Sequence, residues 1–333
     1  MKAIVVHSDK ENLQLEWEDM DAPSPGPGEV LLEIHAAGVN RADLLQARGH
    51  YPPPPGESPV LGLEVAGQVK TVGLGVEAWG PGDRVCALAP GGGYAEQIVL
   101  PQGMLIPLPD RWPYVWGAAV PEVWLTAYSN LCMEGSLGNG ETVLIHAGAS
   151  GVGTAAIQLA QELGARVAVT AGSDEKLVRC RELGADLAIN YKRDDFGEKC
   201  RAFSRGQGVD LVLDCIGGAY LERHIDLLKP YGRLITIGLM GGTSARLDMR
   251  ALLMKSLTLK GTRLRARSLE AKTEITRQFR DRIWPLLVAG KIAPVIDRVF
   301  PVTLAQSAHA HLNANRNIGK VVLEVRPGNG DGG

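Results

Sequence analysis

The alternation of hydrophobic and polar residues divides the chain into two kinds of segment. Over the first 120 residues or so, short apolar or alternating runs are separated by turns rich in glycine and proline, a pattern typical of β-strands. The predicted strands are 2–6, 13–18, 30–35, 60–71 and 83–88. One short helix is expected over 41–48, stopped by Gly49. The stretch YPPPPGESP at 51–59 is expected to be a stiff extended loop, because proline lacks an N–H and its ring fixes φ.

From about Glu141 the pattern changes to apolar strands that alternate with amphipathic helices. TVLIHAG is followed by GVGTAAIQLAQEL, and the rhythm continues to SLTLKG at 256–261. Such an alternation predicts βαβ units, a parallel doubly wound sheet and right-handed crossovers. One long helix is then expected over 268–289, followed by a strand at 295–302, a short helix and a last strand at 318–325. The tail RPGNGDGG is expected to fray.

Composition narrows the function classes. A chain of 333 residues suggests about two domains, and 45% hydrophobic with 22% charged residues excludes global disorder. The net charge of −2 offers no whole-chain attraction to nucleic acid or to an anionic membrane. No apolar run approaches the ~18 residues of a membrane span, and the N-terminus lacks the apolar region of a signal peptide. Five scattered cysteines argue against a disulfide framework, so a cytoplasmic location is expected.

A glycine-rich loop, AGASGVG at 147–153, lies between a predicted strand and a predicted helix. This is the context that pyrophosphate binding needs: a tight turn, close backbone approach and a helix N-terminus with free N–H groups. Gly148, Gly151 and Gly153 follow the spacing G-x-x-G-x-G instead of G-x-G-x-x-G, and glycine also serves plain βα turns. The βαβ context favours a nucleotide site.

The end of the second strand indicates which dinucleotide binds. NAD enzymes usually carry Asp or Glu there for the ribose 2′-hydroxyl, whereas this strand ends in Ala171, Gly172 and Ser173. Ser173 can donate a hydrogen bond, Lys176 supplies positive charge and Tyr191 ends the third strand. This set suits a 2′-phosphate and predicts NADP. The alternative is that Lys176 is a solvated residue in the first turn of a helix.

Longer segments carry a family resemblance. They are GEVLLEIHAAGVNRADLLQARGHYPPPPG, AGASGVGTAAIQLAQELGA, TAGSDEKLVRCRELGAD, LDCIGG, GLMGG and NIGKVVLEV. From residue 1 to about 325 the chain resembles the zinc-free quinone oxidoreductase branch of the medium-chain dehydrogenase/reductase superfamily. It is most similar to the stress-inducible NADPH quinone oxidoreductases, which are zeta-crystallin-like.

The resemblance implies an α/β fold in which a Rossmann domain, with a doubly wound parallel sheet, joins a GroES-like β-rich catalytic domain. The expected boundaries are 1–121 for the first part of the catalytic domain, 122–263 for the Rossmann NADP-binding domain, and 264–333 for the returning part of the catalytic domain with the C-terminal tail. The resemblance also implies NADPH-dependent reduction of a small-molecule quinone, and homodimers.

Zinc alcohol dehydrogenases of the same superfamily provide a contrast. Their catalytic metal uses a Cys where this chain has Asn40, and a His where it has Leu63. Their structural metal needs clustered cysteines, and this chain has no C-x-x-C. No metal is therefore expected.

The resemblance places three candidate catalytic residues, Asn40, Asp43 and Tyr51, near the nicotinamide. Asn40 would hydrogen-bond the carboxamide or a substrate oxygen, and Tyr51 would donate to the developing phenolate, since a phenol with a pKa near ~10 is a donor. Each has a structural alternative. Asn40 suits a helix N-cap and Asp43 the dipole of the helix first turn, while Tyr51 could pack on the prolines.

The resemblance also points to a cofactor-binding set. Its members are Thr126, Ser150, Gly151, Val152, Gly172, Ser173, Lys176, Tyr191, Ile216, Gly238, Leu239, Met240, Gly241, Arg263, Asn317 and Lys320. Thr126 and Glu122 lie where the chain enters the Rossmann half, and helix packing is the alternative there. Arg263 begins the run RLRAR, which as a charge run is more often a solvated face. Asn317 and Lys320 would otherwise be a solvated strand start.

Three functions remain open. The first is an NADPH:quinone oxidoreductase, and the second is a reductase of activated C=C bonds in enoyl thioesters or alkenals. The third is a cofactor-binding protein with a mainly non-catalytic role such as RNA binding, carried by a basic face around 246–267, against which the net charge argues. A homodimer is expected through strand 256–261, because no further βα unit follows to cover that sheet edge.

Overall fold

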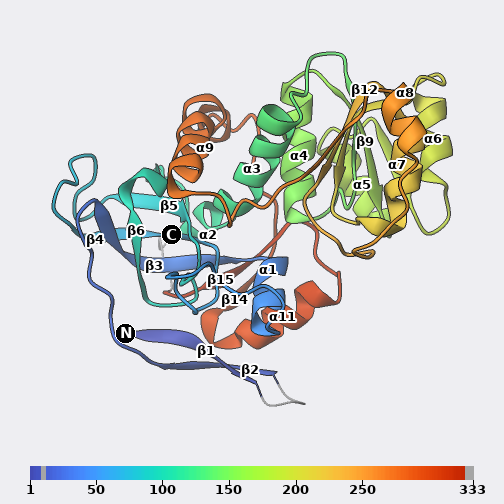
Figure 1. The fold of residues 1–333 in the computed structure, drawn as a ribbon. Helices are drawn as coiled ribbons and strands as arrows, with labels where there is room; N and C mark the ends of the chain where they lie inside the picture. The colour runs from blue at the N-terminus through green and yellow to red at the C-terminus, as the bar shows by residue number, and fades with distance from the viewer. Residues whose placement is uncertain (9–12, 327–333) are drawn as a thin grey trace. The chain divides into compact units, whose positions relative to one another are not determined.

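The computed structural model describes residues 1–8 and 13–326, and the chain forms two compact units (Figure 1). The first unit combines Met1–Leu125 with the chain from Arg265 onward, and the second is Thr126–Leu264. The second unit thus begins four residues after the expected boundary at 122, inside a helix. Most of the tail expected to fray, 327–333, lies outside the described residues. In the described part of the chain, no helix combines the length and the apolar character that a membrane crossing requires.

The second unit is built on a six-stranded parallel sheet with the order β10-β9-β8-β11-β12-β13. Its strands are β8 (Thr142–Ile145), β9 (Arg166–Ala171), β10 (Leu187–Asn190), β11 (Val209–Asp214), β12 (Leu228–Thr236) and β13 (Thr258–Gly261). Its helices are α4 (Gly151–Glu162), α5 (Asp174–Glu182), α6 (Phe196–Phe203), α7 (Leu221–Leu227) and α8 (Met249–Met254). Numbered within the unit, this is the order 3-2-1-4-5-6 of a Rossmann fold, and the predicted doubly wound sheet is confirmed.

Burial explains why these segments form a central sheet. All four residues of β8 are buried, and α4 buries an unbroken run from Gly153 to Ala160. Helices cover both faces of a parallel sheet, so the sequences of its strands are continuous runs of apolar residues. Because the strands are parallel, the loops that follow β8, β9, β10, β11 and β12 emerge at one edge of the sheet, where such folds bind ligands.

The first unit contains a seven-stranded sheet and a separate two-stranded sheet of β1 and β2. The strands are β1 (Lys2–Ser8), β2 (Leu13–Asp19), β3 (Glu29–Val39), β4 (Glu64–Val72), β5 (Arg84–Leu88), β6 (Gln97–Pro101), β7 (Leu105–Pro107), β14 (Ile296–Pro301) and β15 (Lys320–Glu324). The main sheet runs β14-β15-β3-β4-β5-β7, and β6 pairs with β3. The antiparallel pairing of β15 with β3, with Val321 opposite Val39, joins the two ends of the chain in one domain.

Most of the remaining helices are short, and α9 is the longest of them. They are α1 (Arg41–Ala47), α2 (Tyr114–Gly117), α3 (Pro121–Tyr128), α9 (Leu269–Arg282), α10 (Trp284–Val288) and α11 (Ala305–Asn313), and α3 continues into the second unit. The single long helix expected over 268–289 is wrong, because two helices meet at Ile283. Pro285 explains the break: it has no N–H for a helical hydrogen bond and its ring clashes with the preceding turn, so it fits only at a helix start.

Candidate active site

A cluster of buried polar side chains lies in the first unit where β3, β4 and β15 meet the start of α1. Asn40 follows β3, Asp43 lies in α1, Glu64 begins β4 and Lys320 begins β15. Their exposed fractions are 9%, 0%, 0% and 3%. Charged residues are almost never this deeply buried unless they are paired, so the cluster has to satisfy its own charges.

Lys320 is the cation of the cluster. Its Nζ lies 2.6 Å from Glu64 Oε1, and donates to Asn40 Oδ1 at 2.7 Å and to the Val39 carbonyl at 2.9 Å. An ammonium group has three hydrogens, and these three contacts use all of them. The alternative of a solvated strand start is wrong, because Lys320 is buried; its expected contact with the cofactor stays a prediction. Lys320 fixes the side chain of Asn40.

Glu64 accepts hydrogen bonds on both carboxylate oxygens. Oε1 receives Asn40 Nδ2 at 2.8 Å beside the Lys320 ammonium, and Oε2 receives the backbone N–H of Glu122 at 2.9 Å. Sequence reasoning missed Glu64, because a glutamate at a strand start gives no sign of burial. Its two oxygens hold the Asn40 amide and the first turn of α3 together.

Asn40 occupies the N-cap position of α1, as its structural alternative predicts, and it forms a capping box with Asp43. In this box the Asp43 carboxylate accepts the Asn40 backbone N–H at 2.8 Å. The Asn40 amide also contacts Glu64 and Lys320. A further contact from its Nδ2 to the Gly38 carbonyl is long, at 3.5 Å, so this amide hydrogen can serve a better-placed acceptor.

Asp43 connects α1 to neighbouring loops. Its carboxylate accepts the N–H of Gly62 at 3.0 Å and the hydroxyl of Tyr94 at 3.2 Å. Tyr94 Oη also lies 3.2 Å from His309 Nε2. Burial raises the pKa of Asp43 to about 6, against the opposing effect of these hydrogen bonds. A role of Asp43 in the helix dipole alone therefore does not account for its contacts with Gly62 and Tyr94. The sequence did not indicate that Tyr94 and His309 lie beside Asp43.

Glu122, in the first turn of α3, differs from the other carboxyl groups. Its Oε2 is buried and has no hydrogen-bond partner among the described residues. Burial, followed by the negative charge of Glu64, raises its pKa to about 8. Glu122 as a whole is half-buried, and this shift of its pKa favours the uncharged carboxylic acid near neutral pH.

Tyr51 is half-buried in the proline-rich loop, and Arg265 holds that loop. Arg265 Nη1 donates to the Tyr51 carbonyl at 3.4 Å and Nε donates to the Pro90 carbonyl at 2.7 Å, while the guanidinium lies 5.4 Å from the Tyr51 ring centre. Arg265 is 4% exposed, whereas Arg263 is exposed. The run RLRAR therefore contains one buried arginine, and it is not the member that sequence reasoning selected.

The glycine loop of the second unit leads into α4. Ser150 is the N-cap, and its Oγ accepts the Gly153 N–H at 3.0 Å. A Cβ on Gly153 would lie 2.4 Å from the Ala147 carbonyl oxygen, so packing alone requires that glycine. Gly151 and Val152 are half-buried in the first turn, where backbone N–H groups lack helical partners. This arrangement fits a pyrophosphate.

The residues expected at a ribose phosphate gather where β9 and β10 end. Ala171 pairs with Asn190, and a Cβ on Gly172 would lie 2.8 Å from Tyr191 Oη. Ser173 caps α5 and accepts the Lys176 N–H at 3.4 Å, which leaves its own hydroxyl hydrogen as a donor. The nearest acid along the chain, Asp174, is exposed and forms an ion pair with Arg193.

The other predicted cofactor residues lie on several elements. Ile216 donates its N–H to Asp214 Oδ1 at 2.8 Å, and Gly241 donates to the Ile216 carbonyl at 2.7 Å. The loop 238–241 is thus tied to the end of β11, with Leu239 and Met240 each 54% exposed and Gly238 half-buried. Thr126 (8% exposed, α3) and Asn317 (6%) are buried, and Asn317 Nδ2 donates to the Gly319 carbonyl at 2.7 Å.

The side chains around Asn40 do not fit a zinc ion. Zinc sites in proteins use thiolate, imidazole and carboxylate donors, whereas the Asn40 amide oxygen already accepts from the ammonium group of Lys320. Elsewhere, His7, Glu16 and Glu18 on the β1–β2 hairpin are close enough to bind a cation. His7 and Glu18 form a direct contact of 2.7 Å there, which requires no metal.

Comparison with known proteins gives two family matches. Residues 26–110 match the alcohol dehydrogenase GroES-like domain, and residues 151–279 match the zinc-binding dehydrogenase family. These matches fall on the two kinds of unit that the structure shows. They define a medium-chain oxidoreductase fold.

Individual relatives support the same assignment. The chain is 32% identical to a 2-haloacrylate reductase of Burkholderia sp, over 96% of this chain and 98% of that protein. It is 31% identical to the quinone oxidoreductase of Rattus norvegicus, over 92% of each. The mycobacterial protein Rv1454c, solved in complex with NADPH, is 30% identical with a TM-score of 0.86, covering 97% of this chain and 99% of that one. The chain belongs to the medium-chain dehydrogenase/reductase superfamily and is an oxidoreductase.

Some relatives are much longer. The spectinabilin polyketide synthase protein NorB of Streptomyces orinoci is 36% identical over 92% of this chain, but the match spans only 14% of NorB. The same fold therefore occurs both as a segment of large synthases and as most of a protein of this size.

Proposed function

We propose that this protein is an NADPH-dependent quinone oxidoreductase that works without a metal. The buried network of Asn40, Glu64 and Lys320 carries the proposal, because it orients an amide at position 40, where zinc enzymes of the superfamily carry a cysteine ligand. The acid-free end of β9 and the NADPH complex of a similar protein support NADPH as the cofactor. When bound, NADPH supplies the hydride.

The residues that would hold NADPH fall into three groups. The amides of Gly151 and Val152 at the start of α4 would bind the pyrophosphate, because first-turn N–H groups are free donors. Lys176, Ser173 and Tyr191 would surround the 2′-phosphate. Thr126, the loop 238–241, Arg263 and Asn317 complete the set that the family resemblance implies.

Asn40 would act as a fixed hydrogen-bond donor. Lys320 holds its amide oxygen and Glu64 holds one of its amide hydrogens, so the amide cannot flip. The second hydrogen, with its long contact to Gly38, would be offered to a carbonyl oxygen of the substrate or of the nicotinamide carboxamide. A donor that is oriented in advance stabilises developing negative charge without reorganisation.

Tyr51 would be the second donor to the substrate oxygen. Arg265 fixes the backbone of its loop through the Tyr51 carbonyl. A phenol hydroxyl remains a donor throughout the neutral pH range. Its role would be to share the charge that develops on the quinone oxygen.

Reduction of an activated C=C bond is the second candidate function. The similarity to a 2-haloacrylate reductase favours it, since an acrylate carries an alkene activated by a carboxyl group. The same donors would then stabilise an enolate oxygen. By contrast, no feature of the described residues favours a non-catalytic role such as RNA binding.

The deciding experiment is an NADPH-oxidation assay of the purified protein with one panel of quinones and one of enals and acrylates. We expect the highest kcat/KM with a quinone. A higher kcat/KM with every alkene would favour the second function, and no turnover with either panel would argue for the non-catalytic role.

The absence of a catalytic metal is tested with the same assay. We expect full activity after dialysis against a chelator, because Asn40 and Leu63 cannot replace the missing thiolate and imidazole. Stoichiometric zinc that is lost together with activity would contradict this prediction.

A further inference from the structure

We propose that Glu122 stores a proton and delivers it to the reduced substrate, an inference that rests on the proposed function. The candidate mechanism so far contains hydrogen-bond donors but no group that gives up a proton. Glu122 is not among the residues that the family resemblance indicates, and its carboxyl group has an environment unlike that of its neighbours.

Hydrogen bonds are unevenly distributed among the three carboxyl groups. Glu64 accepts from Lys320, from Asn40 and from a backbone N–H, and Asp43 accepts from three donors. Glu122 Oε2 is buried and accepts from none. An anionic carboxylate oxygen without a donor is costly inside a protein, whereas a carboxylic acid is not. The unpartnered oxygen therefore marks the group that keeps a proton.

Charged groups of both signs surround the Glu122 carboxyl group. Glu64 and Asp43 make ionisation of Glu122 unfavourable, whereas Lys320 and Arg265 make it favourable. Lys320 lies 2.6 Å from Glu64, so much of its charge is balanced there. Burial has the largest effect and raises the pKa of Glu122 to about 8. The positive end of the α3 dipole opposes this shift, but such effects are modest.

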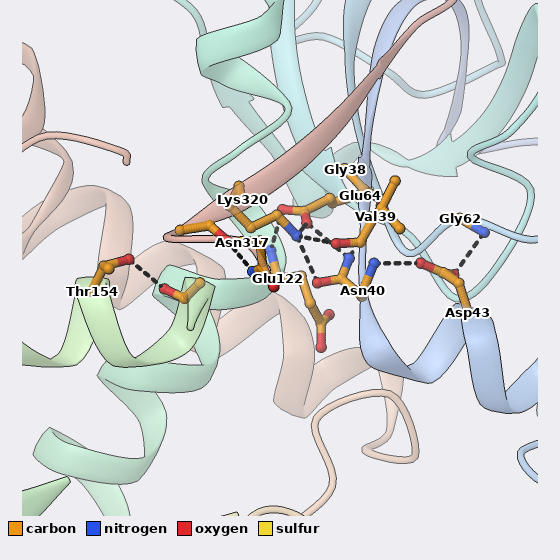
Figure 2. Close-up of polar contacts among 12 residues, drawn as sticks. Gly38, Val39, Asn40, Asp43, Gly62, Glu64, Glu122, Thr154, Asn317 and Lys320 are labelled. Atoms are coloured by element: carbon orange, nitrogen blue, oxygen red, sulfur yellow. Dashed lines mark hydrogen bonds and ion pairs between the residues drawn. The ribbon is translucent and has the colours of Figure 1, made fainter. Parts of the chain in front are cut away.

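Glu64 links Glu122 to Asn40. Glu64 accepts from the Asn40 side chain on one oxygen and from the Glu122 N–H on the other, so one carboxylate holds both residues. Glu122 thus belongs to the same site as the amide that we propose for substrate binding. Figure 2 shows its carboxyl group with no contact to the other side chains drawn. A proton there would be available to a bound molecule.

The proposed step balances in atoms and charge. A quinone that becomes a hydroquinone takes up one hydride, which carries both electrons, and one proton. The O–H bond of Glu122 breaks, an O–H bond forms on the substrate oxygen, and the carboxylate of Glu122 then regains a proton from water. With an activated alkene, the same proton would go to the α-carbon. General acids of this kind contribute about 10²- to 10⁴-fold to a rate.

The protonation state is tested first, without turnover. We expect the infrared carbonyl band of a protonated carboxylic acid at pH 7 in the cofactor-free protein, with a titration midpoint near pH 8. Glu122→Gln should lack this component, and Glu274→Gln should retain it, because Glu274 is a surface carboxylate paired with Arg277. An unchanged band in Glu122→Gln would overturn the stored proton.

Thermal unfolding provides an independent check that the variant folds. The proton that Glu122 holds in the folded state is lost on unfolding between the ordinary glutamate pKa and about 8, so this group makes the protein less stable as pH rises through that window. From pH 6.5, above the titration of Asp43, to pH 9, the Tm of the wild type should fall more than that of Glu122→Gln. Parallel Tm curves would count against the raised pKa.

Steady-state kinetics then test whether Glu122 delivers its proton to the reduced substrate. Glu122→Gln should lower kcat about 100-fold with little change in the KM for NADPH, and Glu122→Asp should recover part of kcat because it keeps an acid. The wild-type kcat should fall above pH 8, and this fall should be absent from the pH profile of Glu122→Gln. A wild-type kcat and pH profile in Glu122→Gln would overturn proton delivery. Failure of the wild type to oxidise NADPH would instead overturn the proposed function, while the infrared titration would still decide where the proton lies.

Discussion

At the scale of single residues, the site depends on one buried cation among three carboxyl groups. Lys320 is 3% exposed and has contacts with Val39, Asn40 and Glu64. Breaking a buried ion pair from one side costs more than removing both partners, because it leaves an uncompensated charge. The stability of the first unit should therefore respond sharply and non-additively to changes at this pair.

We expect Lys320→Met to lower the free energy of unfolding by about 3–5 kcal/mol, as for other broken buried pairs. The double variant Lys320→Met/Glu64→Gln should recover part of that loss, since no charge is left unpaired. Urea denaturation of both proteins measures the difference. Lys70→Met is the control: Lys70 lies in β4 with an exposed side chain, 3.9 Å from Glu33, and such pairs contribute at most about 1 kcal/mol. Equal losses in the single and double variants would show that the ion pair is not what matters.

Sequence reasoning selected Asn40, Asp43 and Lys320, but not how they interact. It offered a helix cap for Asn40, and the structure places Asn40 at the N-cap of α1. It did not indicate that the side chains of Asn40 and Lys320 bind each other. The pairing of β15 with β3 joins residues about 280 positions apart, and no local pattern reveals which strands are neighbours. Glu64 was missed for the same reason, and Glu122 was noted only for its place at the entry to the Rossmann half.

At the scale of elements, hydrophobic periodicity was a good guide. It predicted the alternation of strands and helices from β8 to β13, because strands buried on both faces and helices buried on one face leave distinct patterns. It failed at α9 and α10, where an apolar pattern continues through Pro285 although the backbone cannot. Pro285 itself marks the break in the sequence, because a proline fits only in the first turn of a helix.

The junction of β9 and α5 contains the residues that we expect to select NADPH over NADH. A lysine contact with a phosphate is a charge-assisted hydrogen bond worth about 1.5–3 kcal/mol, and 1.4 kcal/mol is a factor of ten. Lys176→Ala should therefore raise the KM for NADPH at least tenfold and leave the KM for NADH nearly unchanged. Steady-state kinetics with both cofactors measure this, with Lys199→Ala, an exposed lysine of α6, as the control. An unchanged ratio of the two KM values would argue against a 2′-phosphate contact.

At the scale of the whole molecule, the edge strand β13 supports a proposal of homodimers. It is the last strand of its sheet, and Thr258 and Lys260 are exposed. Lysine often protects a free edge, but here Lys260 forms an ion pair with Glu134. Helix α8, just before β13, exposes Met249, Leu253 and Met254 at 63%, 77% and 72%. An unpaired edge beside exposed apolar side chains favours antiparallel pairing with a second copy about a two-fold axis.

Light scattering should give a mass of twice the 35.6 kDa chain mass for the wild type. Thr258→Pro should shift the protein toward monomer, because proline removes a backbone donor from the strand edge. Thr258→Ala keeps that donor and should remain dimeric. A wild-type mass near 36 kDa at micromolar concentration would contradict the proposal.

The ammonium group of Lys320 also limits how this scaffold can be redesigned. A protein engineer who wished to install a zinc centre would begin with Asn40→Cys and Leu63→His, the two ligand types that zinc enzymes of the superfamily carry at these positions. Lys320 contacts both Asn40 and Glu64, so the new thiolate would adjoin the Lys320 ammonium group before any metal arrived. Two cations in so small a buried space repel strongly. A zinc-binding version of this protein would have to lose its lysine as well as gain its ligands.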